Sequence, residues 1–417
     1  MILDVVRAVV AIVLVFLVCV VIHELGHFLV AKKSGVNVPA FAVGFGPKLW
    51  KRVWKGTEFS IRAFPLGGMV QLAGEIPQDS LFRKGEEIAV LRDDEGRITV
   101  LGDPVDVPRG QVAKLVDLDL THRMSMTLDF GDGPSAFSVR SPAKLMTGAR
   151  SSMVLVNRNE QVLGKPLWQR AAMILAGPAM NFLLAGVLFA VYFMQSGVPT
   201  DSTRIGGVLP GSAAAAAGIR AGDQIVAVDG RPVSQWTQLR QIILSNNKSA
   251  HHQLVLDINR NGTPIQLKVT PAQEPTGPEL GIEESIDHSP ITAVKTGFST
   301  MYYTSIHAVE MYGQIVRHHD LSTLSGPVGI ADVISSQAQQ SVWRVVMVAG
   351  LLSLNLGLFN LLPFPALDGG RLLFMVFEMI RGKAVDPRKE SLVHFVGFAL
   401  LMLFAVVITY RDVARLF

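Results

Sequence analysis

Three long apolar runs constrain this 417-residue chain more than any other feature of its sequence. They cover residues 1–31, 171–194 and 392–409, and each reaches the roughly 18–20 residues that a helix needs to cross a bilayer core. The composition agrees, because 49% of the residues are hydrophobic and only 17% are charged, which is unusual for a soluble globular protein. We therefore expect a multi-pass α-helical membrane protein.

A fourth apolar region, residues 342–380, is too long for one simple span. Its middle, NLLPFPALDGG, contains Asn360, Pro363, Pro365 and Asp368 and is typical of a discontinuous helix. Irregular backbone is tolerated at membrane depth only where protein or a water-filled cavity satisfies its polar groups. The break should therefore line an internal site, and the chain should have four transmembrane segments.

The basic residues predict the orientation of these segments. Two stretches beside the membrane are enriched in them: Lys32, Lys33, Lys48, Lys51, Arg52 and Lys55 after the first run, and Arg381, Lys383, Arg388 and Lys389 before the last. The positive-inside rule places both stretches in the cytoplasm. Both termini and the region between segments two and three are then extracytoplasmic, although Arg411 and Arg415 weakly oppose this orientation.

Three further features narrow the class of protein. Met1–Asp4 contains no basic residue and the first run is long, so we expect a retained helix rather than a cleaved signal peptide. Cys19 is the only cysteine, which excludes an intramolecular disulfide, and its apolar setting predicts a small buried residue rather than thiol chemistry. The net charge of +4 is too small and too dispersed to indicate nucleic-acid binding.

Three regions outside the four segments have a soluble or interfacial composition. Residues 41–74 alternate apolar with small or polar residues and predict a membrane-associated β-hairpin, whose edge offers unpaired backbone groups to an extended peptide. Residues 81–163 contain short strand-like pieces between turns and predict a small β-rich cytoplasmic insert. Residues 289–335 are rich in aromatic side chains and predict an amphipathic helix at the membrane surface, with plain packing as the alternative.

Residues 203–272 have the order of elements of a PDZ domain. A strand leads to an alanine helix ending at Gly218, a Gly-Asp turn feeds the strand QIVAVDG, and Asn261-Gly262 joins two alternating strands. PDZ domains bind a chain terminus or an extended segment by strand addition. The predicted orientation makes this domain extracytoplasmic, and the alternative is a generic small αβ domain without a ligand.

The first run contains VIHELGHFLV, which places three ionisable groups inside a membrane-length helix. His23 and His27 are four residues apart and project from one helix face, with Glu24 beside them. This is the geometry of two imidazole ligands of a zinc ion and one general base. A helix whose histidines only satisfy neighbours is disfavoured, because a charge at a helix centre costs about 2.5–3.5 kcal/mol, whereas a bound zinc contributes on the order of 10 kcal/mol.

The third metal ligand should come from another membrane segment, because residues near His27 on its own helix point along the same face. Asp368 is the best candidate, since the prolines and glycines around it free the backbone to aim a carboxylate inward. The alternative role for Asp368 is to cap the helix that resumes at Gly369.

The chain resembles the site-2 protease family of intramembrane zinc metalloproteases, and within it the bacterial RseP/RasP branch with a single PDZ domain. The resemblance covers nearly the whole chain. The motifs that carry it, in chain order, are HELGH, GPAMNF at residues 177–182, the PDZ-like order of elements, SGPVGI at residues 325–330, and NLLPFPALDGG.

The resemblance implies a role for each candidate residue. Glu24 would activate the attacking water, and the hairpin edge would pair with an unwound substrate helix. The implied ligands of Zn²⁺ are His23, His27 and Asp368. The residues implied to hold substrate near the metal are Asn360, Pro363 and Pro365.

The implied activity is hydrolysis of peptide bonds in or near transmembrane segments, after another protease has made a first cut. The expected partners are single-span type II or trimmed anti-sigma-like membrane proteins, signal-peptide remnants, and the lipid bilayer of the bacterial cytoplasmic membrane. Two alternatives belong to other classes. A metal transporter would use the same three ligands as a transit site but has no use for Glu24. An inactive PDZ scaffold would predict erosion of HExxH, which is intact.

Overall fold

The structure, a computed structural model, describes residues 2–75, 78–148, 151–245, 253–274, 277–318, 325–383 and 385–416. Residues 149–150 of the predicted insert, 246–252 of the predicted PDZ-like domain and 319–324 of the predicted interfacial region lie outside the described residues. The chain forms two compact units, residues 1–188 with 301–417, and residues 189–300.

Four described helices are long and apolar enough to cross a membrane, in agreement with the four predicted segments. They are α1 (Ile2–Lys33), α2 (Leu167–Ser196), α7 (Val342–Asn360) and α9 (Pro387–Leu416). The expected discontinuity is also present, because α7 ends at Asn360 and α8 (Asp368–Arg381) begins after a break at residues 361–367.

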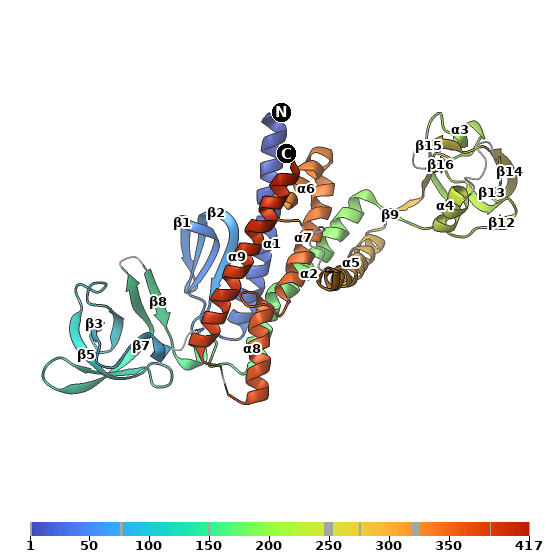
Figure 1. Ribbon diagram of the computed structural model, residues 1–417. Coiled ribbons are helices and arrows are strands. Elements are labelled where there is room, and N and C mark those ends of the chain that lie inside the picture. Colours follow the sequence, from blue (N-terminus) through green and yellow to red (C-terminus); the bar gives the residue numbers. More distant parts are fainter. Residues whose placement is uncertain are drawn as a thin grey trace. The chain divides into compact units, whose positions relative to one another are not determined.

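The region expected at residues 289–335 divides into two helices, α5 (Pro290–His318) and α6 (Pro327–Gln340), so its expected end falls inside α6. α6 belongs to the packed core, since Ile334 is fully buried in one cluster with Val15 and Cys19. Its neighbours in this unit are α1, α7 and α9 (Figure 1). The burial of Cys19 agrees with its interpretation as a small core residue.

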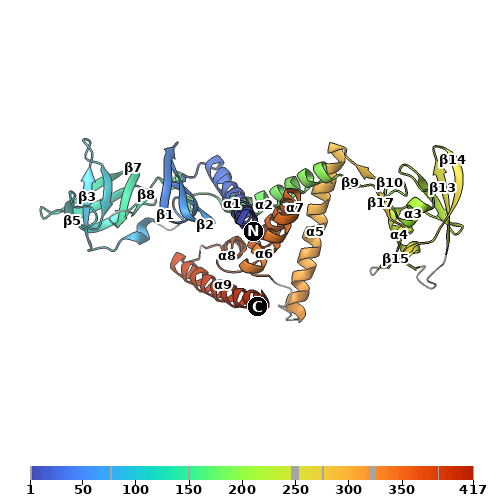
Figure 2. The same ribbon diagram turned by 90° about the horizontal axis from the view of Figure 1, so that it is seen from above.

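The predicted hairpin is present as two long antiparallel strands, β1 (Ala40–Trp54) and β2 (Thr57–Gln71), which lie beside α1 in both views (Figures 1 and 2). The register shows more than a simple hairpin. Residues 40–43 pair on one side with 58–61 and on the other with 68–71, while residues 48–54 pair with 57–62. Each strand therefore contributes two segments to a four-segment sheet, and residues 68–71 form one of its edges.

The expected β-rich insert is a six-stranded sheet of β3 (Glu87–Arg92), β4 (Ile98–Gly102), β5 (Gln111–Asp119), β6 (Ser125–Asp129), β7 (Pro134–Gly148) and β8 (Ser151–Leu155). Short 3₁₀ turns, η1 (Gln78–Leu81) and η2 (Arg158–Glu160), flank it. A parallel pairing between β4 and β7 closes the strands β4-β3-β5-β6-β7 into a small barrel around an apolar core. Closure leaves fewer strand edges open to other chains.

The second unit contains the predicted PDZ-like domain. Its main sheet has the order β12-β11-β13-β14, and α3 (Ala213–Ala216) and α4 (Trp236–Ser245) accompany it. These strands are β11 (Gln224–Val228), β12 (Arg231–Pro232), β13 (Leu254–Arg260) and β14 (Thr263–Val269). Asn261 and Gly262 form the predicted turn between β13 and β14, with φ of 50° and 86°.

The expected end of this domain at residue 272 is too early. β10 (Ile205–Val208) pairs with β17 (Ile282–Glu284), and Leu280 lies in the same apolar core as Ile205. The domain therefore needs the chain up to β17 to complete its core. The remaining strands are short: β9 (Val198–Pro199), β15 (Ala272–Glu274), β16 (Gly277–Glu279) and β18 (Ile286–Asp287).

Candidate metal centre

α1 brings the two histidines of HELGH together as their spacing predicts. The Nε2 atoms of His23 and His27 are 3.2 Å apart, and the rings meet edge to face. The His23 residue is only 8% exposed although it is polar. Two imidazoles therefore direct ring nitrogens at one point inside the unit formed by residues 1–188 and 301–417, which is called the membrane unit below.

Asp368 supplies a third atom to the same point. Its Oδ2 lies 3.2 Å from Nε2 of His23 and 3.4 Å from Nε2 of His27. The alternative role as a helix cap is not observed. Asp368 is the first residue of α8, the N-cap position is Leu367, and no side chain makes a capping hydrogen bond there. Oδ2 is buried and has no hydrogen-bond partner among the described residues.

The spacing of these three atoms fits a zinc ion. Ligands about 2.0–2.1 Å from a tetrahedral metal are roughly 3.3 Å from one another, which is the size of the observed triangle. Two imidazole nitrogens and one carboxylate oxygen are also a donor set that zinc prefers, with a fourth position left open. Within the described parts of the chain, no other group of His, Cys, Asp and Glu side chains converges in this way.

α2 orients both imidazoles from behind. Nδ1 of His27 lies 2.8 Å from the carbonyl oxygen of Met173, to which it donates, so that Nε2 keeps its lone pair for a metal. The amide nitrogen Nδ2 of Asn181 lies 3.1 Å from Nδ1 of His23. If the amide oxygen and nitrogen exchanged places, the oxygen would accept a hydrogen bond from a protonated Nδ1, the tautomer that leaves Nε2 free for a metal.

Glycine at residue 177 allows α2 to approach the two histidines. A Cβ atom there would lie 2.3 Å from Nε2 of His27 and 2.8 Å from Cε1 of His23. Gly26 of α1 has the same function from the other side, since its Cβ would lie 2.2 Å from the carbonyl oxygen of Ala176. Small residues at both positions permit the close helix contact that the site needs.

A cavity of about 520 Å³ opens beside the three converging atoms. Glu24 forms part of its wall, next to the edge segment of β2, where a Cβ on Gly68 would meet the Glu24 side chain at 2.5 Å. Asn360 also lines the cavity. Pro363 and Pro365 lie in the break between α7 and α8 but are not among the lining residues.

Comparison with known proteins decides the family. The family model of peptidase family M50 matches residues 11–404. The chain belongs to peptidase family M50. It is a zinc metalloprotease with membrane helices, and zinc is its cofactor, so the interpretation as a metal transporter is wrong.

Curated relatives agree over their whole length. "Zinc metalloprotease RasP" of Geobacillus kaustophilus is 37% identical, over 99% of this chain and 99% of the relative. "Regulator of sigma-W protease RasP" of Bacillus subtilis is 33% identical over the same shares. Among solved structures, the PDZ domain of an SdrC-like protein from Listeria innocua matches 21% of this chain and 98% of that chain, at 22% identity and a TM-score of 0.19, which is too low to support an argument.

Two parts of this M50 site were not found from the residues alone. GPAMNF supported the resemblance, but the contacts of Gly177 and Asn181 with the histidines were not predicted. Their positions in an apolar helix give no signal of their own, since an asparagine or a glycine there is equally consistent with helix packing.

Proposed function

We propose that His23, His27 and Asp368 bind the catalytic zinc and that Glu24 is the general base of peptide-bond hydrolysis inside the membrane. The observation that carries this proposal is the convergence of three ligand atoms beside Glu24 in a cavity bordered by a strand edge. Burial of three ionisable groups at this depth is unfavourable unless a cation is held there.

Each residue around the metal centre has a separate role in this proposal. The bound zinc supplies Lewis acidity to the scissile carbonyl and to the attacking water. Glu24 lines the same cavity, and its carboxylate takes the proton from the water and passes it to the leaving amine. Met173 and Asn181 hold the imidazole rings in place. Asn360 faces the cavity from the end of α7 and hydrogen-bonds the substrate backbone.

The edge of the β2 segment at residues 68–71 binds the substrate. A transmembrane helix hides its own carbonyl groups, so it must be locally extended before hydrolysis. Residues 68–71 line the cavity and pair with another strand on one side only, as far as the described pairings extend. An extended substrate can add to this edge and bring one carbonyl to the metal. Pro363 and Pro365 do not line the cavity; they act indirectly, by keeping the break between Asn360 and Asp368 non-helical.

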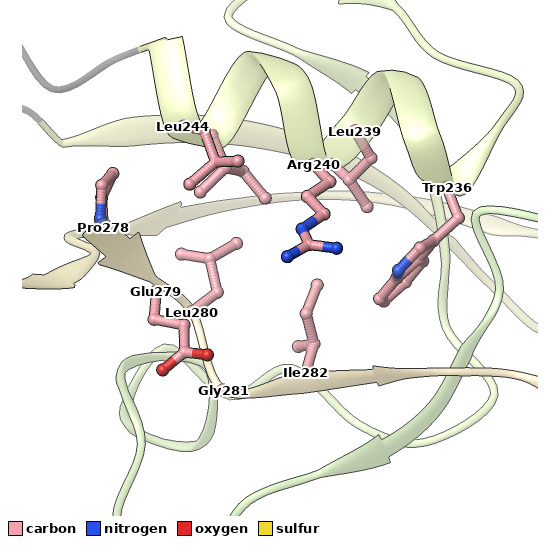
Figure 3. Close-up of a pocket in the computed structure, with 10 residues that line it drawn as sticks. Trp236, Leu239, Arg240, Leu244, Pro278, Glu279, Leu280, Gly281 and Ile282 are labelled. Carbon is pink, nitrogen blue, oxygen red and sulfur yellow. The ribbon is translucent and has the colours of Figure 1, made fainter. Parts of the chain in front are cut away.

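The substrates are membrane proteins that another protease has already shortened, and the PDZ-like domain admits them by size from the extracytoplasmic side. A groove of about 260 Å³ runs between α4 and the segment from Pro278 to Ile282, which joins β16 to β17. Figure 3 shows Arg240 pointing from α4 into this groove, beside Trp236. The Bacillus subtilis relative is named for the regulation of sigma-W, which supports anti-sigma-like substrates. The four apolar helices support a location in the bacterial cytoplasmic membrane. Both termini are extracytoplasmic, as the basic flanks indicate.

The Glu24→Gln variant tests this function. It keeps the size of the side chain and removes the base, so we expect unchanged zinc content and cleavage reduced by about 10²–10⁴-fold. Purified wild type and variant are compared with a single-span substrate, with and without a zinc chelator. Full activity of the variant would contradict the role of Glu24 as the base. A loss of zinc as large as the loss of cleavage would show that Glu24 is a ligand instead.

A further inference from the structure

The break that precedes Asp368 is held from outside by α9. Ala366 has φ of 76°, a left-handed backbone conformation that residues with a side chain rarely adopt. Its N–H donates a hydrogen bond of 2.8 Å to Nδ1 of His394. The two residues are 28 positions apart in the chain, so this contact joins the last membrane helix to the turn that leads into a proposed zinc ligand.

A second contact holds the same turn against α9 one helical turn further on. A Cβ atom on Gly397 would lie 2.4 Å from Cβ of Pro365 and 2.7 Å from its carbonyl oxygen. Gly397 and His394 are three residues apart and therefore lie on one face of α9. That face is in contact with two consecutive residues of the break.

The turn also folds tightly onto the start of α8. A Cβ on Gly370 would lie 2.3 Å from the carbonyl oxygen of Phe364, and one on Gly369 would lie 2.2 Å from that of Leu362. The backbone around Asp368 thus has little freedom once the turn is formed. Movement of Ala366 is passed on to the Asp368 carboxylate, two residues away.

The state of the His394 ring follows from this hydrogen bond. Nδ1 accepts a hydrogen bond from a backbone N–H, so it carries no proton itself, and the proton of the neutral ring is on Nε2. Nε2 is buried without a hydrogen-bond partner among the described residues, and it lies 3.9 Å from a carboxylate oxygen of Glu390. The ring also packs against Phe374 at a centroid distance of 5.5 Å, but this apolar contact does not use the acceptor at Nδ1.

We propose that His394 is a positioning residue: it holds Ala366 in the left-handed turn that aims Asp368 at the two imidazoles. This inference rests on the proposed ligand set. His394 does not touch the metal atoms, so its effect is on the geometry and affinity of the metal site. A residue that orients a metal ligand typically contributes 10–100-fold to metal affinity.

Matched substitutions separate the acceptor from the bulk of the ring. His394→Asn keeps an oxygen acceptor near the position of Nδ1, whereas His394→Gln moves its acceptor to the position of Nε2, and His394→Leu has none. Phe395→Leu, on the lipid-exposed side of the same turn, is the control. Gly397→Ala is an independent variant, because its methyl group displaces Pro365 rather than removing a hydrogen bond.

The experiment uses the full-length protein in detergent, with zinc replaced by cobalt(II). The visible absorption of four-coordinate cobalt reports the ligand geometry, and chelator competition reports the affinity. We expect wild-type spectra for His394→Asn and Phe395→Leu. For His394→Gln, His394→Leu and Gly397→Ala we expect altered spectra and a dissociation constant raised by about 10–100-fold. Circular dichroism checks that each variant is folded.

Asp368→Asn is the reference that separates the inference from the function on which it rests. If Asp368→Asn binds cobalt like the wild type, the ligand set is wrong. If Asp368→Asn loses cobalt while folded His394→Leu keeps the wild-type spectrum and affinity, the ligand set stands and the positioning role is overturned. Equal losses in His394→Asn and His394→Leu would also overturn it, because the acceptor would then not matter.

Discussion

Two buried carboxylates, one in each unit of the molecule, have opposite surroundings. Asp223 in the PDZ-like domain is 2% exposed and accepts hydrogen bonds of 2.8 Å from Nε and Nη2 of Arg260 and from the backbone N–H of Arg220. Asp368 in the membrane unit has a buried oxygen with no hydrogen-bond donor in the described residues, and this oxygen faces two imidazole nitrogens. Burial alone therefore does not distinguish their roles.

The difference shows how a metal ligand can be recognised. A carboxylate that protein donors satisfy completely contributes to folding, and it needs nothing more. A carboxylate whose neighbours are themselves metal ligands is in a favourable state only when a cation lies between them. Asp223 is of the first kind and Asp368 of the second.

The sharpest test of this comparison replaces each carboxylate by its amide. Asp368→Asn removes one of three proposed ligands, so we expect a loss of zinc affinity beyond the roughly 10–100-fold effect of an orienting residue, together with loss of cleavage. Asp223→Asn should leave zinc stoichiometry unchanged and make the PDZ-like domain more sensitive to limited proteolysis. Metal analysis after dialysis against a chelator gives the first result. Retention of zinc by Asp368→Asn would show that Asp368 is not a ligand and would contradict the distinction between the two carboxylates.

A second test moves the imidazoles instead of the carboxylate. In Gly177→Ala, the new methyl group meets Nε2 of His27 at 2.3 Å, so the ring must shift. A displacement of this order in a catalytic site costs about 10²-fold, and we expect that loss of cleavage with a lower zinc content. The control is Gly313→Ala, on α5, where a Cβ meets nothing within 4 Å. Similar activities of the two variants would show that the close contact of α2 is not needed.

The sequence predicts the parts of this site that depend on local spacing. His23 and His27 share a face because of the helical period, and the prolines and glycines around Asp368 mark a broken helix. It also predicts four membrane helices, the Asn261-Gly262 turn and a β-rich insert. The contacts that orient the ligands are different. Asn181 lies 158 positions from His23, and no local pattern indicates such a pair. The pairing of β10 with β17 was missed for the same reason.

SGPVGI shows how a long-range contact can explain a motif. Its two glycines donate backbone N–H groups to Oδ2 of Asp412, at 2.8 Å and 2.9 Å, and a Cβ on Gly326 would lie 2.8 Å from that oxygen. Asp412 thus ties the end of α9 to the start of α6. It is 7% exposed and, like Asp223, is satisfied by protein donors. The motif alone does not reveal this, because its partner is 86 positions away.

Asp412 therefore gives a smaller, purely structural prediction within the membrane unit. Asp412→Ala leaves two N–H groups without their acceptor, so we expect the free energy of unfolding to fall by roughly 1–3 kcal/mol. Zinc affinity should not change. Thermal unfolding in detergent measures the first quantity and chelator competition the second. A loss of zinc as large as that of Asp368→Asn would show that the two kinds of carboxylate cannot be separated in this unit.

The smallest effect concerns acid and the PDZ-like domain. The Arg260 side chain, hydrogen-bonded to Asp223, holds the pKa of that carboxyl below its ordinary value of about 3.9. A carboxyl with a lowered pKa contributes its full stabilisation above the unfolded-state value and loses it as the pH falls through the folded-state value. Between pH 5 and 8, the stability of the wild-type domain and that of Asp223→Asn should therefore differ by a constant amount, and below about pH 4 the difference should shrink.

Hydrogen exchange of the amides in β11 and β13 measures this stability locally, and comparison of the two proteins at each pH cancels the intrinsic exchange rates. A difference that stays constant down to pH 3 would mean that Arg260 and Asp223 are not coupled in solution, and the contrast with Asp368 would then rest on burial geometry alone.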